Sequence, residues 1–183
     1  MTIPAKKFSQ HIDKLNELAQ SDPINELALQ RIKNEANRLL DSDKAGAFML
    51  LGAIASLLRD EKALHRQHLA ALHWTDDKAW ALQNYSNSLL WVEDFSGALE
   101  IAQKAYELDH SPDSLSLMIR SAVGIGLTGL AREFCAEWRK LTGESHKLET
   151  AASYPGIVRD SVMQILEDDL TTHAELWKRL AKV

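Results

Sequence analysis

Apolar residues recur at steps of three and four along most of the chain, and short polar turns interrupt the pattern. Between Trp80 and His110 this recurrence appears twice, once before Glu93-Asp94 and once after it. This recurrence is typical of an amphipathic α-helix with one buried face. The segment therefore predicts two helices joined by a tight turn, which Phe95 is expected to fill.

Small side chains occupy the positions where these two helices would touch. Ser86 stands in the first helix, and Ala98, Ala102 and Ala105 stand in the second. Side chains of this size allow two antiparallel helices to approach closely. Gly52 takes the place of Ser86 in an earlier stretch. The spacing resembles the tetratricopeptide repeat (TPR), a helix pair of about 34 residues that stacks with its neighbours into a solenoid.

Two weaker copies flank the unit that begins at Trp80. Ala63 precedes Ala98 by 98 − 63 = 35 residues, and Ala131 follows it by 131 − 98 = 33. Trp138 stands where the third copy would have its second alanine, so we expect that copy to be less regular. Together the three TPR-like units cover residues 43–142.

Further helices are expected before and after the three units. The apolar pattern predicts a helix over residues 5–20 and a second helix with Pro23 at its first position. Residues 145–181 contain Pro155-Gly156 as a break and two more apolar stretches. Stacked repeats leave an apolar face at each end. We therefore expect residues 5–41 and 145–181 to form helical caps.

Polar residues and glycines mark where the helices should begin and end. A short polar side chain can accept a hydrogen bond from a free N–H at a helix start, and glycine adopts the left-handed conformation that ends many helices. Gly143 is expected to end the last repeat helix. Ser111-Pro112 is expected to open a helix. The expected N-caps are Asp60, Thr128 and one of Asp41, Ser42 and Asp43.

The sequence as a whole predicts an all-α fold. It holds 8 glycines and 4 prolines, and no stretch alternates cleanly between apolar and polar residues as a strand would. We expect a single helical domain over residues 1–183. The resemblance implies a short right-handed α-solenoid of about three TPR-like helix pairs with helical caps at both ends.

Composition narrows the classes of partner. The chain has 21 Lys and Arg against 26 Asp and Glu, a formal net charge of −5, which disfavours nucleic acid. It shows no apolar run long enough for a signal peptide or a membrane span. The single cysteine, Cys135, is expected to be buried beside Phe134 and Trp138. We therefore expect a cytoplasmic protein with no membrane partner.

The resemblance implies that partners bind to the first helix of each pair, which lines a concave groove in TPR proteins. Asparagine suits the backbone of a bound peptide because its amide both donates and accepts hydrogen bonds, and arginine suits a carboxylate. Apolar residues suit an amphipathic helix. The partner-binding candidates are Met49, Trp80, Gln83, Asn84, Asn87, Leu90, Trp91 and Arg120.

One known use of TPR grooves does not fit this chain. Relatives that hold the carboxylate tails of chaperones use lysines and asparagines, whereas Met49 and Ala53 stand at those places in the first unit. The expected function is a protein–protein interaction module, an adaptor or a chaperone, with no enzymatic activity and no cofactor. The alternative is a structural subunit that associates with itself, for example as a homodimer.

Two chemical alternatives rest on one helix. Glu61, His65 and His68 have a spacing compatible with a metal ion, but no second group of ligands accompanies them. Arg59 followed by His65 resembles, loosely, the arginine and histidine of small helical ribonucleases of the HEPN class.

Gly124, Gly126 and Gly129 resemble a dinucleotide-binding motif but lack the strand that it requires. We expect neither a metal site nor a nucleotide site.

Overall fold

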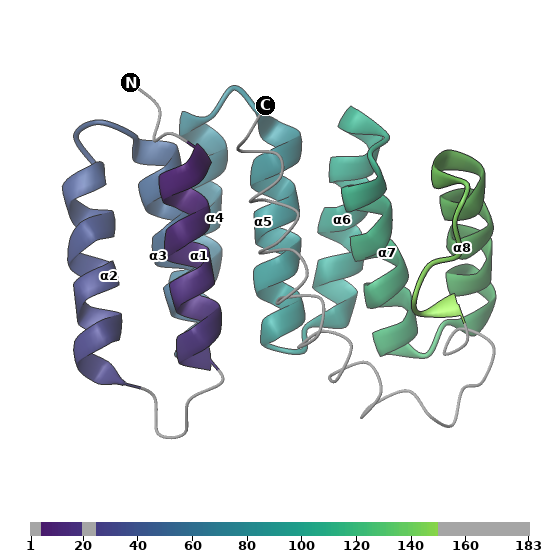
Figure 1. Cartoon of the computed structure of the whole chain (residues 1–183), viewed down its shortest axis with the longest axis horizontal. Helices are drawn as coiled ribbons and strands as arrows, with labels where there is room; N and C mark the ends of the chain where they lie inside the picture. The colour runs from purple at the N-terminus through teal and green to yellow at the C-terminus, as the bar shows by residue number, and fades with distance from the viewer. Residues whose placement is uncertain (1–4, 20–24, 150–183) are drawn as a thin grey trace. The chain divides into compact units, whose positions relative to one another are not determined.

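The computed structural model describes residues 5–19 and 25–149, which form helices and no strand (Figure 1). The all-α prediction is confirmed for this part of the chain. The described residues divide into two compact units, one ending at Asp76 and the other beginning at Asp77. Most of the predicted cap at 145–181, with Pro155-Gly156, lies outside the described residues.

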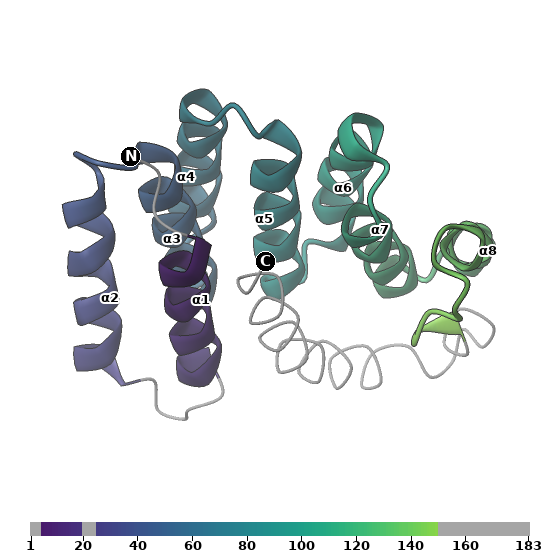
Figure 2. The same ribbon diagram turned by 45° about the horizontal axis from the view of Figure 1, so that its top comes forward.

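The first unit is arranged around a helix that is apolar on most sides. It contains α1 (Ala5–Ala19), α2 (Glu26–Leu39), α3 (Lys44–Leu57) and α4 (Glu61–Trp74). Helix α3 packs against each of the other three, as Figures 1 and 2 show. A helix with so little polar surface must be covered on several faces. Its largest fully buried side chains are Met49 and Leu50.

The second unit has its core around α7. It contains α5 (Lys78–Trp91), α6 (Phe95–Asp109), α7 (Pro112–Ile125) and α8 (Thr128–Thr142). Helix α7 packs against α5, α6 and α8, and it lies between α6 and α8 in Figure 2. Every residue from 114 to 123 is buried, with Leu115 and Ile119 among the largest.

The close approach of α5 and α6 is confirmed. The Ser86 hydroxyl donates a hydrogen bond of 2.8 Å to the carbonyl oxygen of Ala98. Ala98, Ala102 and Ala105 have no exposed surface. Phe95 reaches farther than the turn that it was expected to fill, because its ring lies where a Cβ on Gly124 of α7 would stand. Phe95 therefore joins the α5–α6 pair to the next pair.

Five successive helices begin at evenly spaced N-caps. Each cap side chain accepts a hydrogen bond from the backbone N–H three residues later. The differences 60 − 43, 77 − 60, 94 − 77 and 111 − 94 all equal 17. Two such intervals match the TPR period of about 34 residues per helix pair. The five caps are Asp43, Asp60, Asp77, Asp94 and Ser111.

Two predicted helix starts were wrong. Leu127, not Thr128, occupies the N-cap position of α8, and no side chain caps that helix. Gly126 ends α7 in the left-handed conformation, and α8 begins two residues later at Thr128, so Thr128 is already helical. Helix α2 begins at Glu26 behind an Asn25 cap, later than the start expected at Pro23, which is outside the described residues.

The other predicted signals at helix ends hold. Asp43 is the cap chosen from the polar turn before α3, and Gly143 ends α8 in the left-handed conformation. Within residues 5–19 and 25–149, none of the helices has the length and apolar character that crossing a membrane requires.

Candidate functional site on helix α5

Four of the predicted partner-binding residues lie along one face of α5. We call Trp80, Asn84, Asn87 and Trp91 the α5 stripe. Their separations of four, three and four residues place them on one side of a helix. All four are half-buried, whereas the opposite side of α5 is buried in the unit. The stripe is thus the part of α5 that presents both aromatic and amide groups.

Gln83 lies beside the stripe, but its amide group is already engaged. Its Nε2 atom donates to Asp109 Oδ2 at 2.7 Å and to Ser114 Oγ at 3.0 Å, and it lies 3.2 Å from Ser111 Oγ. These acceptors surround the turn between α6 and α7. Gln83 therefore ties α5 to the start of the next helix pair.

The two asparagines of the stripe differ in their hydrogen bonds. Asn84 Nδ2 donates to the carbonyl oxygen of Trp80, one turn earlier, at 2.9 Å. Asn87 Oδ1 is buried and accepts no hydrogen bond from any residue that the structure describes. An unsatisfied buried acceptor costs about 1–3 kcal/mol. Asn87 is therefore an acceptor for which the described fold provides no donor.

The other three candidates present almost no surface. Met49, in the first unit, and Leu90, in the second, are each 1% exposed, and Arg120 on α7 is 4% exposed. Met49 and Leu90 pack in the cores of their units. In this conformation a partner could touch none of the three without a rearrangement of the helices around them.

A buried serine and histidine were missed by the sequence analysis. Ser116 Oγ on α7 lies 3.0 Å from His146 Nε2. The backbone N–H of Leu148 donates to His146 Nδ1 at 3.2 Å, so Nδ1 carries no proton and Nε2 does. His146 is therefore the donor to Ser116 and cannot take its proton. The pair anchors the chain and does not activate a nucleophile.

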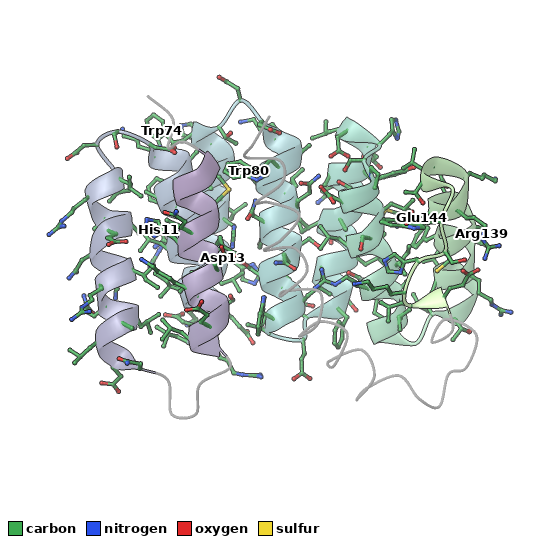
Figure 3. The ribbon with its side chains drawn as sticks, viewed as in Figure 1. His11, Asp13, Trp74, Trp80, Arg139 and Glu144 are labelled. Carbon is green, nitrogen blue, oxygen red and sulfur yellow. The ribbon has the colours of Figure 1, made fainter. Side chains whose placement is uncertain are left out.

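Several contacts fix the segment after α8 to the second unit. The His146 ring meets the edge of Trp138 with their centroids 4.8 Å apart. Arg139 donates to Ser145 Oγ at 3.2 Å and pairs with Glu149. Figure 3 shows Arg139 on α8 and Glu144 where this segment starts. Trp138 thus packs against His146 and holds the start of this segment on α8.

Cys135 is buried in the second unit, as predicted. Burial, reinforced by the nearby Glu149 carboxylate, raises the pKa of its thiol to about 11. The thiolate is the reactive form of cysteine. Cys135 therefore behaves as a small core residue at neutral pH.

The two histidines considered as metal ligands, His65 and His68, lie in different environments. His68 is 1% exposed and lies against Gly52 of α3, whereas His65 is exposed. Burial first, and His65 second, lower the pKa of His68 to about 3. Among the residues described, no three His, Cys, Asp or Glu side chains cluster as metal ligands.

Arg59, the other residue of the ribonuclease-like pair, lies in the turn before α4 with φ 54°.

Comparisons of the chain with family models, with curated proteins and with solved structures found no match.

Proposed function

We propose that the chain is a TPR-like protein-binding module, an adaptor or chaperone of the cytoplasm, whose helix pairs stack as a right-handed solenoid. The repeated N-caps support this proposal, because every second cap opens a new helix pair at the TPR period of about 34 residues. The contact between Ser86 and Ala98 supports it too, since small residues join the two helices of a pair. The module holds a peptide or helical segment of a partner protein.

The unpaired Asn87 acceptor is the observation that carries the proposal. Buried polar groups in folded proteins are nearly always hydrogen-bonded, so one that is not requires an explanation. Asn87 lies between Trp80 and Trp91 on the α5 stripe. Tryptophans with partly exposed rings are common anchors at protein interfaces. Asn87 Oδ1 is itself buried, so the partner must first displace the groups that cover it. A partner segment that does so and donates a hydrogen bond to Asn87 would satisfy the acceptor and cover both rings.

The proposal gives each neighbouring residue a distinct role. Asn87 accepts from the partner, and Trp80 and Trp91 supply apolar contact on either side. Gln83 fixes α5 to the end of α6 and the start of α7 through its hydrogen bonds to Asp109 and Ser114. The buried residues Met49, Leu90 and Arg120 act in the cores of the units and do not touch the partner.

A peptide selection tests the α5 stripe. Displayed random 12-residue peptides are selected on the full chain, and the affinity of each selected peptide is measured by fluorescence anisotropy. We expect the double variant Asn84→Ala, Asn87→Ala to lose at least about tenfold in affinity for them, the loss of a well-placed polar contact at a binding site.

The chain offers a matched control in α2. Asn34 and Asn37 have the same three-residue spacing and are both exposed. The double variant Asn34→Ala, Asn37→Ala should leave the affinity unchanged. Equal affinity in both double variants would refute the assignment of the stripe. Light scattering over a range of concentrations separates this function from self-association, which predicts a dimer that excludes the peptides.

A further inference from the structure

The outward face of α4 combines basic side chains with an exposed leucine. Five residues lie along it at positions that follow one side of a helix, and all five are exposed. Two are cations, two are histidines, and the fifth is a leucine. We call this set the α4 face: Lys62, His65, Arg66, Leu69 and His73.

The charges of Lys62 and Arg66 are not arranged to stabilise the helix. Lys62 and Arg66 are one turn apart, and like charges at this spacing destabilise a helix. Neither residue forms an ion pair with any residue in the described part of the chain. On α6, by contrast, Lys104 stands one turn after Glu100 and pairs with it at 2.6 Å. Lys62 and Arg66 therefore carry positive charge that the described part of the fold does not balance.

Apolar groups stand among these cations. Leu69 is 59% exposed and lies between Arg66 and His73 along the helix. At the end of α4, Trp74 is 51% exposed, and the Lys44 ammonium group lies 3.8 Å from the centroid of its ring. This cation–π contact holds Trp74 at the margin of the face. An exposed leucine flanked by cations complements an acidic surface that has an apolar centre.

We propose that the α4 face docks an acidic amphipathic helix of a partner protein. Carboxylates of that helix pair with Lys62 and Arg66, and an apolar side chain covers Leu69. Nucleic acid fits less well, because phosphates offer nothing to Leu69 and the chain has a net charge of −5. Glu61 lies on the flank of the face and limits how far the acidic partner extends toward the start of α4.

A defined peptide serves as the probe. It is about three heptads long, with leucine at the a and d positions of each heptad, glutamate elsewhere and a fluorescein label. We expect the full chain to bind it, with an affinity that falls as salt rises from about 50 to about 300 mM, because rim charges are screened. A peptide with lysine in place of each glutamate should not bind. Absence of binding by the acidic peptide would overturn the proposal.

Lys62→Glu is the most informative variant. The new carboxylate lies one turn before Arg66, the favourable order for a helical ion pair, so the fold should be as stable as before or slightly more so. Binding of the acidic peptide should weaken about fivefold or more at the lowest salt concentration. Lys33→Glu on α2, also an exposed lysine, should leave binding unchanged. Equal losses in the two variants would show only a general effect of net charge and would overturn the docking site.

The apolar part of the face has an equally close control. Leu69 and Leu108 are both 59% exposed, on α4 and α6 respectively. Leu69→Ala should weaken peptide binding about tenfold, as removal of an interface anchor does, and Leu108→Ala should not.

To test the class of partner, single-stranded oligothymidine and phosphatidylserine vesicles are titrated against the full chain in parallel with the peptide. If either binds more tightly than the peptide and is lost in Lys62→Glu, the partner is not an acidic helix.

The α4 face and the α5 stripe can fail separately. The double variant Asn84→Ala, Asn87→Ala should bind the acidic peptide as the unmodified chain does. A loss of binding in that variant would place the peptide on the α5 stripe and overturn docking on α4.

Discussion

His68 is a titratable side chain enclosed in the first unit. Its ring lies against Gly52, and burial lowers its pKa from 6.5 to about 3. The folded chain therefore holds the neutral imidazole through the whole physiological range. In the unfolded chain the same imidazole takes up a proton near pH 6.5. The two states thus bind different numbers of protons whenever the pH lies between these values.

This difference makes stability depend on pH. Because the pKa of His68 is lower in the folded state, its contribution is complete above pH 6.5 and is lost as the pH falls toward 3. The slope is about 1.4 kcal/mol per pH unit, which gives a loss of about 2 kcal/mol between pH 7 and pH 5. Urea unfolding at the two pH values measures it.

A variant without the imidazole isolates this effect. His68→Gln should be less stable at pH 7, because its amide is buried in place of a fitted ring, but its stability should change less between pH 7 and pH 5. If the variant keeps the slope of the unmodified chain, other groups cause the acid sensitivity.

Gly52 and Gly129 respond in opposite ways to alanine. A Cβ on Gly52 would stand 2.5 Å from His68 Nε2, whereas a Cβ on Gly129 would meet nothing within 4 Å. Alanine favours helix by about 1 kcal/mol at each site, but overpacking costs about 1–3 kcal/mol at the first. Gly52→Ala should lower the free energy of unfolding, and Gly129→Ala should raise it by up to about 1 kcal/mol. Urea unfolding measures both free energies, and a gain from Gly52→Ala would contradict the close packing of Gly52 against the His68 ring.

At the scale of the element, some helix starts could be predicted from the sequence and others could not. Asp60 and Ser111 were correctly predicted because a cap depends on residues only three positions apart. The start of α8 was missed because the left-handed turn at Gly126 places Leu127, rather than Thr128, at the cap. The small residues of the α5–α6 pair were found because their spacing reports a contact between neighbouring helices.

Exposure and distant contacts could not be read from the sequence. Met49 and Arg120 were expected to line a groove because of the resemblance to TPR proteins, but both side chains are buried. The hydrogen bond between Ser116 and His146 joins residues 30 positions apart, and no sequence motif predicts it. The residues of the α5 stripe were chosen from their positions in the TPR-like unit, and their role in binding stays a prediction.

Helix α8 should gain from the cap that it lacks. The backbone of Leu127 has φ −79° and ψ 66°, close to the values of Asp94, which caps α6. Leu127→Asp should therefore accept a hydrogen bond from the N–H of Leu130 and stabilise the fold by about 1 kcal/mol, less the small apolar contact that is lost. Asp94→Ala should lose a similar amount. Thermal unfolding of both variants tests this, and a lower melting temperature for Leu127→Asp would contradict it.

On the scale of the whole molecule, the two compact units have separate cores, with Leu50 in the first and Ile119 in the second. In a repeat array, a destabilised unit opens more often than units farther along the chain, because each contacts only its neighbours. Gly52→Ala should therefore speed amide hydrogen exchange at Leu50 and Leu64 about tenfold for each ~1.4 kcal/mol lost. Exchange at Ile119 and Val123 of α7 should change much less. Native-state exchange followed by NMR distinguishes this from a single cooperative body, in which the slowest amides of both units would accelerate by the same factor.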